Sequence, residues 1–138
     1  MPEKKILVVE DEEGFRGVFE SAAEQEFLKR FFGETNEVRM LIAASVAEAV
    51  EILKFHPIDL LLTDMELGPN LGWEIIAEVK KLAQTPILAV MSGRYEFELA
   101  AKEQGIVFFE KPFSTSFILG WMKEQLFPEI IKISSEKE

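Results

Sequence analysis

The sequence KILVVEDEE at residues 5–13 joins a short apolar run, rich in β-branched residues, directly to an acidic cluster. An uninterrupted apolar run of this length is typical of a strand that is covered on both faces, as in parallel sheets. The sequence IDLLLTD at residues 58–64 repeats the arrangement and ends on the carboxylate of Asp64. Two strands that each end in acidic residues indicate a fold with a buried parallel sheet and a candidate functional site at the carboxyl ends of its strands.

Outward from these two runs, the chain alternates between strand and helix patterns. Further strands are predicted at Val38–Ala43, Pro86–Met91 and Ile106–Phe109, the first of them near a sheet edge. With helices between them, five strand-then-helix repeats favour an α/β fold with a doubly wound, five-stranded parallel sheet and five helices. Ligands bind such sheets beyond the carboxyl ends of the strands.

Apolar residues spaced three and four apart mark the helices, and polar residues mark their starts. The apolar positions are Phe15, Val18, Phe19, Ala22, Ala23 and Phe27 in the first helix; Val46, Ala49, Val50 and Leu53 in the second; Ile75, Ile76, Val79 and Leu82 in the third; Phe97, Ala100 and Ala101 in the fourth; and Phe117, Ile118, Trp121 and Met122 in the last. Ser45 with Glu48 fits a capping box, Ser114 can cap the last helix, and Gly105 and Pro128 are helix-ending residues.

Composition excludes several function classes. The chain has 138 residues, enough for one domain, and no cysteine, so disulfides, thiolate catalysis and cysteine-ligated metals are excluded. Its single histidine, His56, is interpreted as structural. A formal charge of −10 opposes direct binding to nucleic acid or to anionic membrane surfaces. Without a membrane-length apolar run or a signal-peptide core, the sequence favours a soluble, cytoplasmic protein.

Polar residues that follow the predicted strands meet at one edge of the sheet. These are Glu10 and Asp11 after the first strand, Asp64 after the third, Ser92 after the fourth and Lys111 after the fifth. Three carboxylates in one place repel one another, and a hard divalent cation such as Mg²⁺ relieves that repulsion. A lysine and a hydroxyl beside the cation suit a phosphoryl group, for which an Asp carboxylate is an established nucleophile.

The chain resembles the receiver domain of bacterial two-component response regulators in four segments that follow in the family's order. The segments are ILVVEDEE at 6–13, LLLTDMELG at 60–68 with Gly72, TPILAVMSG at 85–93 and FFEKPF at 108–113. The resemblance covers Lys5 to Phe127 and implies a flavodoxin-like sheet of order 2-1-3-4-5. We therefore expect a receiver domain at residues 1–127 and a tail at 128–138, too short for a helix-turn-helix output domain.

By that resemblance Asp64 is the phosphoacceptor, assisted by Lys111 and Ser92. Mg²⁺, or alternatively Mn²⁺, would be held by Asp11, Asp64, the backbone carbonyl of Glu66 and, through water, Glu10. The backbone amides of Met65 and Gly93 would bind phosphoryl oxygens. Lys111-Pro112 is a position where the family commonly has a cis peptide bond.

The resemblance also implies a switch, in which Ser92 moves toward the phosphoryl group and Phe108 rotates inward behind it. The switch alters the surface formed by the fourth helix, fifth strand and fifth helix, where we expect Tyr95 and Trp121. Glu66 and Arg94 flank the path of the hydrolysing water, and we hypothesise that they pair and slow loss of the phosphoryl group. The alternative is an exposed ion pair of little consequence.

The implied function is phosphorelay signalling rather than enzymatic turnover of a substrate. The donor would be a histidine kinase or a histidine phosphotransfer protein, and the output a contact with an unidentified downstream protein. One alternative is a receiver-shaped interaction module that never carries phosphate. Another is a phosphohydrolase of the haloacid-dehalogenase type, but that family needs a second Asp two residues after the nucleophile, where this chain has Glu66.

The chain departs from the family in its spacing. Asp11 and Asp64 are 53 positions apart (64 minus 11), more than the family usually has, and the excess lies between Phe27 and Val38. The favoured interpretation is a longer first helix that buries Phe31 and Phe32 near its end. The alternative is a docking or dimerisation surface, for which Phe32→Ser would change partner binding or self-association without unfolding the protein.

Overall fold

The computed structural model describes residues 3–129 and confirms a five-stranded parallel sheet. The strands of this sheet, in spatial order, are β2 (Val38–Ala43), β1 (Lys4–Val9), β3 (Leu60–Asp64), β6 (Ile87–Ser92) and β7 (Val107–Glu110). This is the predicted order 2-1-3-4-5, because β4 (Glu66–Leu67) and β5 (Asn70–Leu71) form a separate small hairpin. The strand at Val38–Ala43 lies at an edge, as predicted.

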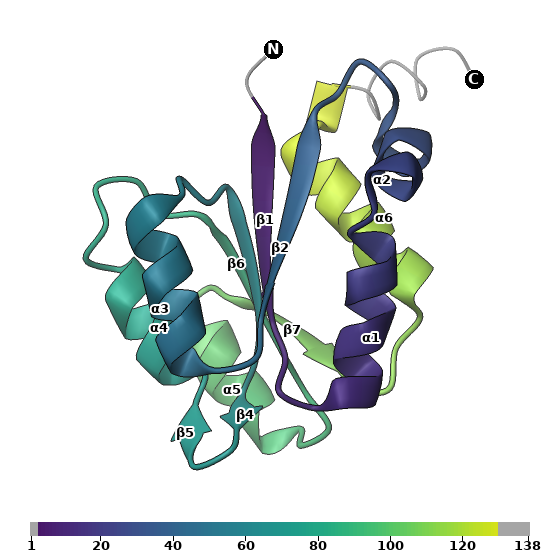
Figure 1. Ribbon diagram of the computed structural model, residues 1–138. Helices are drawn as coiled ribbons and strands as arrows, with labels where there is room; N and C mark the ends of the chain where they lie inside the picture. Colours follow the sequence, from purple (N-terminus) through teal and green to yellow (C-terminus); the bar gives the residue numbers. More distant parts are fainter. Residues whose placement is uncertain (1–2, 130–138) are drawn as a thin grey trace.

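Helices cover both faces of the sheet (Figure 1). The helices are α1 (Glu13–Ala22), α2 (Gln25–Phe32), α3 (Val46–Phe55), α4 (Trp73–Val79), α5 (Glu96–Glu103) and α6 (Thr115–Leu126). In Figure 1, α1, α2 and α6 lie on one side of the sheet, and α3, α4 and α5 lie on the other. No helix within residues 3–129 is long and apolar enough to cross a membrane.

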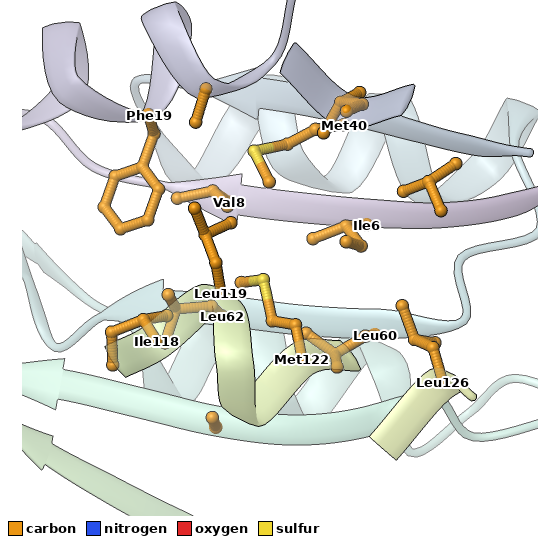
Figure 2. Packing of buried hydrophobic residues seen from close by; sticks show 14 of the residues in the cluster. Ile6, Val8, Phe19, Met40, Leu60, Leu62, Ile118, Leu119, Met122 and Leu126 are labelled. Atoms are coloured by element: carbon orange, nitrogen blue, oxygen red, sulfur yellow. The ribbon is translucent and has the colours of Figure 1, made fainter. Parts of the chain in front are cut away.

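Alternation along the strands divides the core into two clusters. Ile6 and Val8 of β1 point to the side of α1, α2 and α6, whereas Leu7 and Val9 point to the other side. Figure 2 shows the first cluster, in which Val8 and other strand residues meet Phe19 of α1 and Met122 of α6. Because both faces are buried, the carboxyl ends of the strands are where polar groups reach the surface.

The predicted long first helix is wrong, because the chain breaks at Ala23 and Glu24 and forms α1 and α2. Nine residues at about 100° each would place Leu28 roughly 180° around a continuous helix from Phe19. Both side chains are nevertheless buried in one cluster. The extended backbone of Glu24 (φ −66°, ψ 137°) resets the helical phase and lets α2 turn its apolar face to the core.

The break changes which residues are exposed. Phe32 is buried (1% exposed), as the favoured interpretation held, but Val18 and Phe27 of the predicted apolar stripe are exposed. Phe117 on α6 is also exposed. Leu82 is exposed too, because α4 ends at Val79.

The predicted helix starts are confirmed at two serines. The Ser45 hydroxyl accepts a hydrogen bond from the Glu48 amide (3.2 Å), and the Glu48 carboxylate accepts one from the Ala44 amide (2.9 Å). Ser114 caps α6 through the Phe117 amide. Gly105 follows α5 with a φ of 70°, in keeping with its role at a helix end. The predicted tail from Pro128 is described only to residue 129; its remainder lies outside the described residues.

Candidate functional site

Four strands of the sheet deliver polar side chains to one edge. β1 leads into Glu10 and Asp11, β3 ends on Asp64, β6 ends on Ser92, and β7 leads into Lys111. One carboxylate oxygen from each of Glu10, Asp11 and Asp64 lies within 4.8 Å of the others. The acidic cluster predicted from the sequence is therefore assembled by the parallel sheet.

Lys111 binds two of the three carboxylates. Its ammonium nitrogen donates to Oδ2 of Asp64 at 2.8 Å and also to Oε1 of Glu10. The Lys111 side chain is 15% exposed, whereas those of Asp64 and Glu10 are 8% and 0% exposed. One cation thus stands close to the predicted phosphoacceptor in a site with little access to water.

Burial and neighbouring charge change the pKa values of this group. Desolvation, followed by the hydrogen bond and negative charge of Asp64, raises the pKa of Glu10 to about 7 despite the opposing effect of Lys111. Burial by itself lowers the pKa of Lys111, but the hydrogen bonds and charges of Asp64 and Glu10 outweigh it and raise that pKa. The lysine therefore remains positively charged. Because burial and Asp64 disfavour the ionised form of Glu10, the acidic cluster favours the binding of a cation.

The backbone holds Asp64 at the strand end. Its Oδ1 accepts a hydrogen bond from the Glu66 amide at 3.1 Å, and its carbonyl accepts one from the Thr63 hydroxyl at 2.9 Å. Gly72 packs against it so closely that an added Cβ would lie 2.4 Å from the Asp64 carbonyl oxygen. A residue with no side chain is needed there, which accounts for the glycine that follows the small hairpin.

The assignment of the Met65 amide to phosphoryl binding is wrong. That amide donates to the carbonyl of Met91 at 3.0 Å and extends the hydrogen bonding between β3 and β6 by one residue. The amide that points at the Asp64 carboxylate is that of Glu66. The assignment of the Gly93 amide stays a prediction.

Ser92 and Arg94 form the opposite rim of the site. The Ser92 hydroxyl is buried and accepts a hydrogen bond from the Arg94 amide at 3.0 Å. The Arg94 guanidinium lies 3.4 Å from the Glu66 carboxylate, as the hypothesis required, and it also binds Glu96. Glu96, followed by Glu66, raises the pKa of Arg94. Two exposed side chains, Glu66 and Arg94, therefore meet across the mouth of the site.

The predicted switch residue Phe108 and the predicted contact residues Tyr95 and Trp121 lie on or beside β7, α5 and α6. Phe108 on β7 is half-buried against the cluster on the side of α3, α4 and α5. Tyr95 is exposed beside α5, and Trp121 on α6 packs edge-on against Phe109 with 5.1 Å between ring centroids.

Other sequence predictions can be compared with the structure in the same region and beyond it. The Lys111-Pro112 bond is cis. The His56 ring lies beside the Lys5 side chain, with 3.4 Å between Nδ1 and the lysine nitrogen. The movement of Ser92 and Phe108 stays a prediction.

Two residues of the site, both in the first turns of α1, were not predicted from the sequence. The Phe15 ring centroid lies 4.4 Å from the Lys111 nitrogen. The Arg16 guanidinium donates to the backbone carbonyls of Glu10 (3.4 Å) and Asp11 (3.1 Å) and so supports the acidic loop. The available signal was their position directly after the acidic cluster, but helical spacing alone assigned Phe15 to the core.

The donor set at this edge fits a hard divalent cation. Carboxylate oxygens of three residues converge there, and such oxygens are the ligands that Mg²⁺ prefers in proteins. Glu10 is fully buried, and a cation beside it offsets the cost of its burial as a charged group. A phosphoryl group beside Lys111 and Ser92 would find a charge partner and a hydroxyl at the same edge.

Comparisons with known proteins agree with this geometry. Residues 6–120 match the family model described as the response regulator receiver domain. The chain is 26% identical over 124 residues to the transcriptional regulatory protein YxdJ of Bacillus subtilis (strain 168). That match covers 88% of this chain and 50% of YxdJ, so the chain spans about half the length of that relative.

Two solved structures show the same fold at lower identity. The non-phosphorylated HemR receiver domain of Leptospira biflexa has a TM-score of 0.71 and 23% identity, covering 90% of this chain and 94% of that one. The receiver domain of the sensor histidine kinase PA1611 of Pseudomonas aeruginosa PAO1, solved with magnesium in its active-site cleft, has a TM-score of 0.69 and 18% identity. That match covers 90% of this chain and 98% of that one.

Proposed function

Because the chain belongs to the response regulator receiver domain family of two-component phosphorelay signalling, we propose that Asp64 is its phosphoacceptor. The donor is the phosphohistidine of a histidine kinase or a histidine phosphotransfer protein. The observation that carries the proposal is the contact of Lys111 with Asp64 at 2.8 Å beside two further carboxylates.

The reaction is a transfer between two nucleophiles. An Asp64 carboxylate oxygen attacks the phosphorus; a phosphorus–oxygen bond forms as the phosphorus–nitrogen bond breaks, and the electron pair of that bond returns to the imidazole. Lys111 exchanges a carboxylate contact for one to a phosphoryl oxygen, and the amide of Glu66 stands ready beside Oδ1 of Asp64. Positioning and charge neutralisation supply most of the rate in such transfers.

Mg²⁺ is the proposed cofactor, and Mn²⁺ suits the same oxygen ligands. Asp11, Asp64 and the carbonyl of Glu66 would ligate it, and Glu10 would support it through water. When bound, the ion neutralises the negative charge that gathers on the phosphoryl oxygens. The magnesium in the active-site cleft of PA1611 supports the assignment.

The output is a change of surface rather than turnover of a substrate. Ser92 moves toward the phosphoryl group, Phe108 follows, and the face formed by α5, β7 and α6 takes a second arrangement that a downstream protein binds. The chain accordingly catalyses its own phosphorylation and dephosphorylation and no other reaction.

The pair formed by Glu66 and Arg94 sets the lifetime of the phosphorylated form in this proposal. The two side chains meet 3.4 Å apart above the site, with Phe97 beneath the guanidinium at 5.7 Å. A water molecule that attacks the phosphorus in line must pass this rim. The pair therefore slows hydrolysis by occupying that path.

Intact-mass measurement of the full chain with acetyl phosphate tests the phosphoacceptor proposal. Wild-type protein is expected to gain one phosphoryl group when Mg²⁺ is present and to gain none when a chelator is added before the acetyl phosphate. Asp64→Asn is the matched control, since it keeps the shape of the side chain and removes the nucleophile. Beryllofluoride, a phosphoryl mimic, is expected to change tryptophan fluorescence in wild type only. Folded wild-type protein that responds to neither reagent contradicts the proposal and favours a receiver-shaped interaction module.

A further inference from the structure

An aromatic ring contacts the only ammonium group that, within residues 3–129, binds the site carboxylates. The centroid of the Phe15 ring lies 4.4 Å from the Lys111 nitrogen, inside the range of about 6 Å over which a ring face attracts a cation. The Lys111 side chain is 15% exposed, so this attraction is only weakly screened by water.

The ring is fixed from two directions. At the backbone, the Glu12 carboxylate caps α1 by accepting from the amides of Gly14 (3.0 Å) and Phe15 (2.9 Å). At the side chain, the ring packs nearly perpendicular to Phe113, with 5.4 Å between centroids and 73° between planes. Phe113 lies two residues after Lys111, so the segment that leaves β7 carries both the cation and the support of the ring.

The other partners of Lys111 are the carboxylates of Asp64 and Glu10. Both would change partners in the proposed reaction, because Asp64 would acquire the phosphoryl group and Glu10 would support the metal through water. A neutral ring does not take part in these exchanges. It therefore offers the ammonium a partner that is the same before and after phosphorylation.

We propose that Phe15 is a positioning residue, whose ring face holds the Lys111 ammonium in the site while the anionic partners of that ammonium are exchanged. This inference rests on the proposed function of Asp64 and Lys111. Loss of the contact slows phosphorylation by about five- to thirtyfold, the range that corresponds to a cation–π contact between its exposed and its desolvated limits.

Ring fluorination at position 15 separates attraction from packing. Fluorine withdraws electron density from the ring face but changes its shape little, so replacing Phe15 by phenylalanines with one, two and three ring fluorines weakens the cation–π contact stepwise. The measurement is the rate of adduct formation from acetyl phosphate with Mg²⁺, by intact mass. We expect the rate to fall with each added fluorine, Phe15→Leu to be slow, and Phe15→Tyr to retain most of the wild-type rate.

Phe19 provides the matched control. It lies one turn further along α1 in the same aromatic group, 6.5 Å from Phe113 between centroids, and is fully buried in the core. The same fluorine series at Phe19 is expected to leave the rate unchanged. Equal rates across the Phe15 series, or an equal decline in the Phe19 series, overturn the inference. If wild type itself forms no Asp64-dependent adduct, the proposed function fails and the inference fails with it.

Discussion

Glu10 is a completely buried carboxyl group, and this makes the stability of the metal-free protein depend on pH. Its pKa in the folded protein is about 7, above its ordinary value of 4.5, because burial and Asp64 disfavour the charged form. Between these two pH values the folded state holds a proton that the unfolded chain has lost. The free energy of unfolding is therefore expected to fall as pH rises toward and through about 7, by about 3 kcal/mol.

Glu10→Gln, which keeps the shape and removes the charge, is expected to flatten this decline and to raise stability at pH 8. Urea unfolding at pH 5 to 8 in the presence of a chelator measures it. Glu13→Gln, at an exposed glutamate of α1, is the control and should retain the wild-type slope. The retained charge of Lys111 adds no slope in this range, since its pKa is raised from 10.5. A Glu10→Gln variant with the wild-type slope contradicts this account.

Glu66 and Arg94 make a prediction about lifetime. Both side chains are about half exposed, and exposed ion pairs are weak, so the effect of this pair on a rate is at most about fivefold. We expect Glu66→Asn combined with Arg94→Ala to shorten the half-life of the phosphorylated form within that limit. Decay of the adduct after removal of acetyl phosphate measures it, and Glu98→Gln, which breaks another exposed pair with Lys102, is the control. An unchanged half-life in the double variant would show that the pair does not obstruct the water.

At the scale of elements, Phe27 and Phe32 show what the break between α1 and α2 does. Phe32 is fully packed in the core, 6.1 Å from Phe127 between ring centroids, whereas Phe27 is 40% exposed. Phe32→Ser is therefore expected to destabilise the fold by about 3–5 kcal/mol, which is contrary to the docking alternative. Phe27→Ser is expected to cost less than about 1 kcal/mol. Thermal unfolding of both variants measures the difference, and a folded, stable Phe32→Ser protein contradicts the assignment.

The same break shows how far sequence alone could go. Strands such as Leu60–Asp64 were predictable, because burial on both faces leaves an uninterrupted apolar run that needs no knowledge of the partner strands. The break at Glu24 was not, since helical periodicity continues through Phe27 and only the position of β2 requires Leu28 and Phe32 to turn inward.

The candidate site divides in a similar way. The acidic cluster and Lys111 follow from one rule, that parallel strands end at the same edge. The hydrogen-bond partner of the Met65 amide does not follow from this rule, because it depends on whether the hydrogen bonding between β3 and β6 continues past Asp64. The contact of Phe15 with Lys111 likewise depends on how α1 is rotated about its axis. Residue types at strand ends are thus readable from sequence, while the orientation of helices and amides is set by packing.

At the scale of the whole molecule, a charge of −10 raises the question of whether Mg²⁺ acts through the site or through general screening. Binding to the folded state alone stabilises it by about 2.7 kcal/mol at a concentration 100 times the dissociation constant. General screening requires no particular residue and is matched by NaCl of equal ionic strength. The two explanations therefore differ in whether the removal of one carboxylate of the acidic cluster abolishes the effect of Mg²⁺.

Asp11→Asn and Glu51→Gln separate them, because each changes the net charge to −9, one at the acidic cluster and one at an exposed position of α3. Without metal, Asp11→Asn is expected to unfold at the wild-type temperature or above it, since it removes repulsion between carboxylates. With Mg²⁺ it is expected to lose most of the stabilisation that wild type and Glu51→Gln retain. Thermal unfolding with MgCl₂ and with NaCl of equal ionic strength measures both effects. Equal responses of the two variants to Mg²⁺ would assign its effect to the overall charge and would remove the metal from the proposed site.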